Sequence, residues 1–300
     1  MSIYLGAITE GFLWGIMGLG LYISFRILNF ADLTSESSFT LGAAIAVALM
    51  SNGVNPFVAT IVAVFGGMIA GFITGFLTTV FEIPGLLSSI ITMTGLYSMN
   101  LRIMGKPNSS FRGTETIFSQ LEDFFSSELL LDAVVGVFFV GLIILFLNYF
   151  FKTDFGQAII ATGDNAVMAM SLGIKTKSMS RIALMLANGL IALSGALIAQ
   201  NNGFSDVSMG TGTVVVAMAS IVIGEVLIRK ELSLSSRLLS IVLGAIIYRL
   251  ILVFVLRLGL NPNDFKLISA LVLAVFLVFP KVSAFFQERR QKTNNGLGGL

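Results

Sequence analysis

Cysteine and histidine are absent from this 300-residue chain, and charged residues are scarce. Without cysteine, the chain forms no disulfide, thiolate nucleophile or thiolate metal site. Without histidine, it lacks the common zinc ligand and the general base of a serine–histidine triad. Asp, Glu, Lys and Arg make up 11% of the residues, against about 25% in soluble domains. The net charge of +2 is too small to indicate nucleic acid as a partner, so the composition argues against a soluble enzyme and against a nucleic-acid-binding protein.

A phosphate-binding loop is also missing. The Gly-Lys pair at 105–106 is followed by Pro107 and has no glycine five positions upstream. Any process that is driven by ATP therefore needs an ATPase in another chain.

Apolar residues dominate the sequence: they make up 56% of it, and the mean hydropathy is +0.94. About 20 apolar residues in a helix cross a bilayer core of about 30 Å, and a helix keeps its backbone groups paired in lipid. We predict an all-α polytopic membrane protein with about 8–10 transmembrane helices. Of the expected segments, 40–51 is too short to span alone. The segments are 4–25, 40–51, 56–80, 86–104, 133–151, 181–200, 212–228, 238–256 and 264–280.

The loop charges predict the orientation, because loops rich in Lys and Arg stay in the cytoplasm. The 152–181 loop and the 281–300 tail are basic, whereas the 105–132 loop is mainly acidic. Nine crossings, with the N-terminus outside and the C-terminus inside, satisfy these assignments. If the segment 40–51 re-enters without crossing, the side of the N-terminus reverses.

A short motif occurs twice. Residues 30–34 (Phe-Ala-Asp-Leu-Thr) recur in similar form at 204–208 (Phe-Ser-Asp-Val-Ser), each copy between a long apolar segment and a short one. Further on, a proline opens a later segment in each half, at Pro84 and Pro262. The predicted orientation puts the first copy inside and the second outside. This pattern favours two inverted-topology halves, about 1–128 and 152–280, as in many transport paths; the alternative is two unrelated polar loops.

Polar residues within reach of the membrane are candidates for a substrate path. An aspartate at the centre of a membrane helix costs about 2.5–3.5 kcal/mol on insertion scales, so such residues should border water or protein. The polar run 29–38 fits a path, and it fits equally an ordinary cytoplasmic loop that caps the next helix. The candidate path residues are Asn29, Asp32, Thr34, Glu36, Ser37, Asp206, Tyr248 and Arg249.

Arg249 is the clearest charge inside an apolar segment and should have a partner. That partner is either a carboxylate of this chain or an anionic group of a substrate. Glu10 lies near the outer end of the first segment, where we expect solvation at the interface to suffice.

Glycines at 67, 71 and 75, and at 11 and 15, form stripes of small residues that allow close helix contact. Packing inside the chain is the favoured interpretation, and a dimer interface is the alternative.

The basic 152–181 loop contains a short helix signal. Asp164 or Asn165 can cap its start, and Gly173 can end it. The intervening Ala, Met and Leu residues give it an apolar face. A helix of about two turns is unstable alone, so we expect it to pack on a partner; lying on lipid is the alternative.

Residues 156–174 resemble the coupling segment of permease subunits of ATP-binding-cassette (ABC) importers, in the family that serves branched-chain amino acids, ribose-type sugars and nucleosides. The stretch 29–31 followed by 39–43 resembles the first-half motif of that family, and 211–224 resembles the second. The resemblance covers about residues 5–280. The residues that carry it in the coupling segment are Gly156, Ala161, Gly163, Asp164, Asn165, Ala169, Leu172, Gly173 and Ile174.

Within this family the chain is most similar to tryptophan/tyrosine (aromatic amino acid) importer permeases of Gram-positive bacteria. The stretches 104–108, 245–250, 260–264 and 266–268 carry that similarity. The ribose-type branch has a glycine-rich variant where this chain has Asp32-Leu33-Thr34, which argues against a sugar.

The resemblance implies a transport subunit that is not itself an enzyme and holds no cofactor. Residues 1–280 would form the permease domain in a bacterial plasma membrane, with 281–300 as a polar cytoplasmic tail. A second copy would complete a homodimer, an ABC ATPase subunit would bind ATP and Mg²⁺, and an extracellular substrate-binding lipoprotein would deliver an aromatic or branched-chain amino acid. The coupling residues, in the segment 163–174, would be Gly163, Asp164, Asn165, Ala169, Met170, Leu172, Gly173 and Ile174.

The sequence also bears on two other functions. A stand-alone secondary transporter or channel would suit the inverted motif and the acidic residues near it, although intramembrane carboxylates are few. A membrane enzyme has less support, because no combination of nucleophile, base and metal ligand stands out.

Overall fold

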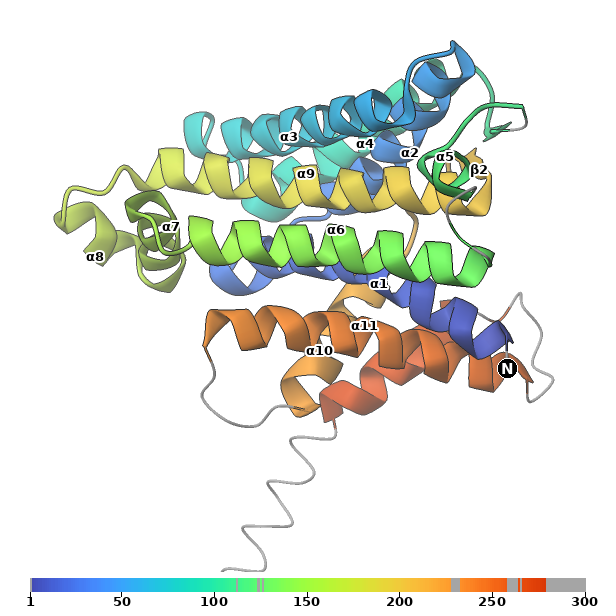
Figure 1. Cartoon of the computed structure of the whole chain (residues 1–300). Helices are drawn as coiled ribbons and strands as arrows, with labels where there is room; N and C mark the ends of the chain where they lie inside the picture. Colours follow the sequence, from blue (N-terminus) through green and yellow to red (C-terminus); the bar gives the residue numbers. More distant parts are fainter. Residues whose placement is uncertain are drawn as a thin grey trace, which may run out of the picture.

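The computed structural model describes residues 2–111, 113–122, 125, 127–227, 233–257, 264 and 266–278. Its long helices lie side by side in one bundle, with short connections at the two ends (Figure 1). The helices are α1 (Ser2–Tyr22) with its π-helical continuation η1 (Ile23–Ile27), α2 (Thr34–Ser51), α3 (Pro56–Val80), α4 (Gly85–Met104), α5 (Ile117–Leu121), α6 (Glu128–Phe150), α7 (Asp154–Asp164), α8 (Ala166–Ser171), α9 (Thr176–Asn202), α10 (Thr213–Leu227) and α11 (Leu234–Arg257), and the strands are β1 (Asn108–Ser110) and β2 (Phe204–Asp206).

Five helices in the described part of the chain are long and apolar enough to cross a membrane. They are α1 with η1, α3, α6, α9 and α11. Two further apolar helices, α10 and Lys266–Val278, are shorter. The prediction of an all-α, polytopic membrane protein is therefore confirmed.

The segment 40–51 is part of a longer helix than its apolar run indicated, although α2 is not among the five helices that are long and apolar enough to cross a membrane. The helix α2 begins at Thr34 and has 18 residues, which gives a length of about 27 Å. Its first turn is polar but buried, and Ser38 Oγ donates a hydrogen bond to Asn188 Oδ1 (2.7 Å) on α9. Protein groups replace water around these hydroxyls, so a polar stretch extends an otherwise apolar helix.

The centre of the bundle is α9. Within its most apolar window 83% of the residues are buried, against 33% for α6. The helices α1, α2 and α3 pack against α9, whereas α3 and α6 also present large apolar side chains at the surface. Exposed apolar faces of this size suit lipid, so the outer faces of α3 and α6 are membrane-facing surfaces.

The glycine stripes are confirmed as packing within the chain. The stripe on α3 faces the backbone of α9, and the pair on α1 faces α11. A Cβ on Gly71 would collide with the carbonyl of Leu184, so the close approach of α3 and α9 requires glycine there. The contacts are Gly67 with Asn188, Gly71 with Leu184, Gly75 with Arg181, Gly11 with Ile246 and Gly15 with Val242.

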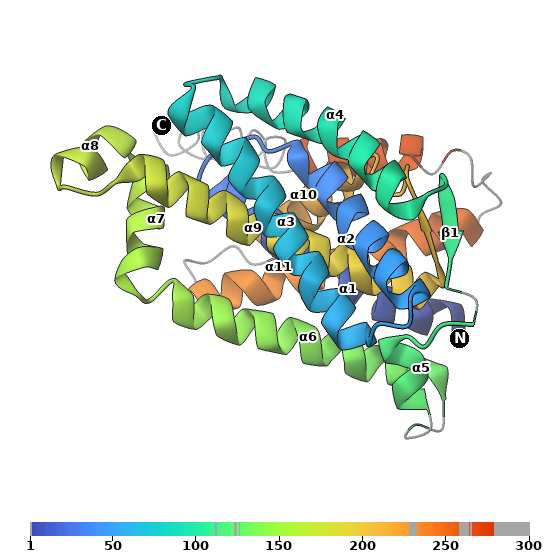
Figure 2. The same cartoon turned by 90° about the horizontal axis from the view of Figure 1, so that it is seen from above.

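The two ends of the bundle differ. At one end β1 pairs antiparallel with β2, with Ser109 opposite Ser205, and α5 lies nearby (Figure 1). At the other end α7 and α8 extend past the long helices (Figure 2). The acidic 105–132 loop and the basic 152–181 loop therefore lie at opposite ends.

Some predictions fall outside the described residues. These are Pro262 and the 281–300 tail.

Candidate functional site

Both copies of the repeated motif make the same turn. Asp32 Oδ1 accepts a hydrogen bond from the backbone N–H of Thr34 (2.9 Å), and Asp206 Oδ1 accepts one from the N–H of Ser208 (2.8 Å). In such a turn the side chain of an aspartate bonds the backbone two residues on. The first copy lies before α2, near α7, and the second lies in and after β2, at the opposite end of the bundle.

Asp32 is fully buried. Its Oδ2 accepts a hydrogen bond from Asn188 Nδ2 (2.7 Å) on α9. Thr34 Oγ1 lies 2.7 Å from Thr74 Oγ1 on α3. These two predicted path residues therefore fasten the start of α2 to α9 and α3, and neither lines the cavities described below.

Asn29 links this turn to α7. It has a left-handed backbone conformation (φ 54°), and its Nδ2 donates to the carbonyl of Gly163 (3.0 Å). A Cβ on Gly163 would collide with the carbonyl of Ile27, the last residue of η1. The end of α7 is thus packed directly on the end of the first membrane helix.

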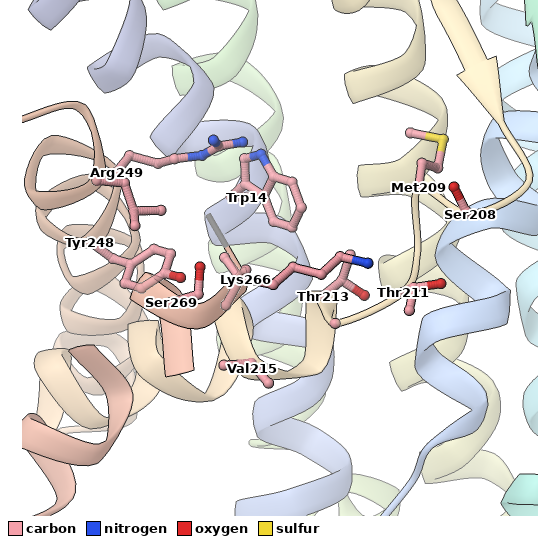
Figure 3. A pocket seen from close by; sticks show the side chains of 13 residues that line it. Trp14, Ser208, Met209, Thr211, Thr213, Val215, Tyr248, Arg249, Lys266 and Ser269 are labelled. Atoms are coloured by element: carbon pink, nitrogen blue, oxygen red, sulfur yellow. The ribbon is translucent and has the colours of Figure 1, made fainter. Parts of the chain in front are cut away.

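A cavity of about 370 Å³ lies between α1, α10, α11 and the Lys266–Val278 helix. We call it the Trp14 cavity (Figure 3). Arg249 Nη2 pairs with Glu10 Oε2 at 3.1 Å, and the guanidinium carbon lies 4.6 Å from the centre of the Trp14 ring. The partner of Arg249 is therefore a carboxylate of this chain, and the expectation that interfacial solvation suffices for Glu10 was wrong. The residues that line the Trp14 cavity include Trp14, Met209, Tyr248, Arg249, Leu252 and Lys266.

A second cavity, of about 410 Å³, lies between α2, α4 and the 207–212 loop. We call it the Glu36 cavity, since Glu36, Ser37 and Tyr97 line it. Glu36 Oε1 accepts a hydrogen bond from the N–H of Gly212 (2.9 Å), and Thr40 Oγ1 accepts one from the N–H of Gly210 (3.1 Å). The 207–212 loop thus contributes lining residues to both cavities, with Thr211 shared between them, and is bound to α2.

Seven of the eight predicted path residues divide into two groups, and Asp206 belongs to neither. Glu36, Ser37, Tyr248 and Arg249 line the cavities, whereas Asn29, Asp32 and Thr34 hold the junction of α1 and α2. Sequence reasoning missed the roles of Trp14 and Lys266. The sequence could have indicated these two residues only by their residue types. Trp14 is the single tryptophan of the chain, and Lys266 is a cation at the start of an apolar segment.

Asp206 lies at the strand end, outside the helices. Its Oδ2 accepts a hydrogen bond from Asn108 Nδ2 (3.2 Å). Partial burial tends to raise the pKa of this carboxyl, but hydrogen bonds from Ser208 and Asn108 outweigh it and leave the pKa of Asp206 below its usual value.

The short helix of the 152–181 loop is α8. Asn165 caps it, with its Oδ1 accepting from the N–H of Met168 (3.0 Å), while Asp164 is the last residue of α7. Gly173 follows in a left-handed conformation (φ 84°), as a helix terminator should. Ala169 faces inward, and the N–H of Ile174 bonds its carbonyl (3.0 Å). The exposed apolar residues of α8 and its end, which we call the α8 patch, are Val167, Met168, Met170 and Leu172.

No group of three or more carboxylates able to hold a metal ion occurs in the described ranges. The site offers instead two membrane cavities with a few polar groups, joined at a loop, and an apolar patch at one end. This combination is that of a membrane transport protein.

Residues 3–279 match the family of permease components of the branched-chain amino acid transport system, and the chain belongs to this family. It is 42% identical over 277 residues to the tyrosine transport system permease protein of Clostridioides difficile (strain R20291), covering 92% of this chain and 91% of that one. It is 31% identical over 234 residues to the autoinducer 2 import system permease protein LsrC of Escherichia coli (strain K12 / DH10B), covering 77% and 65%. Among solved structures, PsaBC from Streptococcus pneumoniae in complex with Fab has a TM-score of 0.48 and 16% sequence identity, covering 92% of this chain and 88% of that one.

The family match and the relative of 42% identity identify the protein as a transmembrane permease of an ABC importer, as the coupling-segment motif indicated.

Proposed function

We propose that this permease carries an aromatic amino acid across a bacterial plasma membrane and takes its driving force from a separate ATPase through α8. The observation that carries the coupling part is the α8 patch, in which Val167 is 74% and Leu172 69% exposed. An apolar patch on a capped, protruding helix is typical of a surface that binds another protein. The relative of 42% identity named for tyrosine transport supports the substrate class.

The basic charge near α8 supports an orientation with this end in the cytoplasm. Lys152, Lys175 and Lys177 lie there, whereas the acidic Glu115 and Glu122 lie at the β1–β2 end. Cytoplasmic loops carry the excess of Lys and Arg. A cytoplasmic ATPase would then meet α8, and an extracellular binding protein would deliver its amino acid to the β1–β2 end.

The surface of α4 supports a second permease copy. Thr94, Tyr97 and Ser98 are exposed on it and line the Glu36 cavity. Polar side chains are unfavourable on a helix surface that faces lipid. The exposed side of α4 is therefore better explained as a water-lined surface between two permease copies. Because the chain has no cysteine, a Thr94→Cys variant should crosslink to a second copy, and a Phe138→Cys variant on the lipid-facing side of α6 should not.

The test of coupling uses the permease reconstituted in vesicles with its ATPase and its binding protein. We expect ATP-dependent uptake of labelled L-tyrosine, and we expect Leu172→Asp or Met168→Asp to lower uptake at least tenfold, since a charge in an apolar contact is strongly unfavourable. Lys152→Gln changes the net charge by the same amount at an exposed position outside the α8 patch. It is the matched control and should transport normally. Normal uptake by the α8 variants would overturn the coupling proposal.

The same vesicles test the stand-alone transporter. Uptake that follows an ion gradient when the ATPase is omitted would favour that function. We expect none, because Asp32 is locked in hydrogen bonds and Glu10 pairs with Arg249, which leaves few groups for ion coupling.

A further inference from the structure

The Trp14 cavity and the Glu36 cavity meet at one loop. Thr211 lines both, and the remaining residues of the 207–212 loop line one or the other. The loop enters from the strand β2 and leads into α10. Thr211 is therefore the place where the two cavities adjoin.

The charges around the loop are of two kinds. Arg249 is balanced by Glu10. Lys266 makes no hydrogen bond or ion pair within the described ranges, and its side chain points toward Thr211 and Thr213 (Figure 3). Lys266 lines the Trp14 cavity and Glu36 lines the Glu36 cavity, and no ion pair joins them within the described ranges. The described hydrogen bond of Glu36 uses Oε1 alone, and a carboxylate has acceptor sites on both oxygens, so Oε2 can accept from a ligand.

The walls of the Trp14 cavity are largely apolar. Trp14, Met209 and Leu252 line the Trp14 cavity. Two buried nitrogens in this wall, Trp14 Nε1 and Arg249 Nε, have no hydrogen-bond partner among the described residues. Buried polar atoms normally have partners, and an apolar pocket with a few convergent polar groups is the usual form of a small-molecule site.

A cation on one cavity and an anion on the adjoining cavity match the two charges of a small zwitterion. We propose that the two cavities form one binding site for an α-amino acid, with Lys266 meeting its carboxylate, Glu36 Oε2 meeting its ammonium group and Trp14 contacting its side chain. This inference rests on the proposed transport of an aromatic amino acid and goes further by assigning the binding groups.

The fluorescence of Trp14 tests the site directly. It is the single tryptophan of the chain and lies in the cavity wall, so its emission, excited where tyrosine does not absorb, reports on the occupant. The full-length permease in lipid nanodiscs is titrated with L-tyrosine, with tyramine, which lacks the carboxylate, and with 3-(4-hydroxyphenyl)propionate, which lacks the ammonium group. We expect L-tyrosine to bind about tenfold more tightly than either analogue, because each analogue loses a charge-assisted hydrogen bond.

Two variants assign the two charges. Lys266→Met should weaken L-tyrosine about tenfold and leave tyramine unchanged, so that the preference between them disappears. Glu36→Gln, which can still accept from Gly212, should abolish the preference for L-tyrosine over the propionate. Lys106→Met and Glu115→Gln, both away from the cavities, should keep wild-type preferences. A purely structural role would weaken all three ligands together.

The proposal is overturned if L-tyrosine leaves the Trp14 emission unchanged, if the analogues bind equally well, or if the two variants keep both preferences. Lys266→Arg keeps the positive charge and should bind L-tyrosine nearly as wild type does, which guards against a folding defect in Lys266→Met. ATP-dependent uptake in vesicles separates this result from the proposed function. If uptake occurs but the Trp14 emission does not respond, the proposed binding site is refuted and the proposed transport function stands. If no amino acid is taken up, the proposed transport function is refuted.

Discussion

The turns at Asp32 and Asp206 have similar sequences and the same hydrogen bond from the residue two positions on, yet their surroundings differ. Asp32 is fully buried and bonds to Asn188 on the central helix. Asp206 is partly exposed at the strand end and bonds to Asn108 on β1. A local motif thus fixes the turn, while the packing around it decides whether the aspartate supports the membrane core or a surface loop.

The largest effect should come from removing the buried carboxylate. Asp32→Ala leaves the N–H of Thr34 and the amide of Asn188 without their acceptor, and we expect a loss of about 2–4 kcal/mol in stability. Asp206→Ala should cost less than about 1 kcal/mol, since water replaces the lost bonds. Thermal unfolding of both variants in the same detergent measures the difference. Equal losses would show that burial does not separate the two turns.

The partners of the two aspartates give the next contrast. Asn188→Ala leaves Asp32 Oδ2 and Ser38 Oγ unsatisfied in the core and should cost about 1–3 kcal/mol. Asn108→Ala, at the exposed turn, should cost less than about 0.5 kcal/mol. The same unfolding measurement applies. A costly Asn108→Ala would mean that the β1–β2 pairing contributes more than its exposure indicates.

A smaller effect should appear in acid. The folded-state pKa of Asp206 is lowered, so its ionised form stabilises the fold above the usual carboxyl pKa of about 4. This contribution is lost as the pH falls from there through the folded pKa. Asp206→Asn should therefore unfold with a weaker dependence on pH below about 4 than the wild type. An unchanged pH dependence would exclude this contribution.

The smallest effect should come from a surface pair at the same end as Asp32. Lys177 Nζ lies 2.9 Å from Glu82 Oε1, with both side chains exposed, and the hydrogen bond from Lys177 lowers the pKa of Glu82. Glu82→Gln should leave the unfolding midpoint unchanged at physiological salt, because exposed ion pairs are weak and screened. A clear shift of the unfolding midpoint would show that the contribution of a carboxylate to stability depends on its lying at the Asp32 end of the bundle and not on its burial.

The coarse fold was predictable because lipid imposes simple rules. Apolar length located most of the helices, and the glycine stripes indicated packing inside the chain. The start of α2 was not predictable, since the hydroxyls of 34–38 are polar by composition and only their bonds to α3, α4 and α9 make them part of a buried helix. The ends of α8 were predictable, because Asn165 and Gly173 act through local backbone geometry.

The candidate site was predictable only in part, for a related reason. The sequence identified Arg249 as a charge in an apolar segment. Its partner, Glu10, lies on α1, 239 positions earlier (249 minus 10), and no local pattern points to it. Lys266 and Glu36 line adjoining cavities only because segments far apart in the chain pack together. No local pattern encodes such a pairing.

The sequence by itself determined the membrane class, the caps of α8 and the two aspartate turns, because these depend on apolar length and on hydrogen bonds between residues close in the chain. The tertiary structure decided which aspartate is buried, which acid pairs with Arg249 and which residues line the cavities. Those outcomes depend on the positions of helices far apart in the sequence, and the close contacts of α3 with α9 and of α1 with α11 fix them.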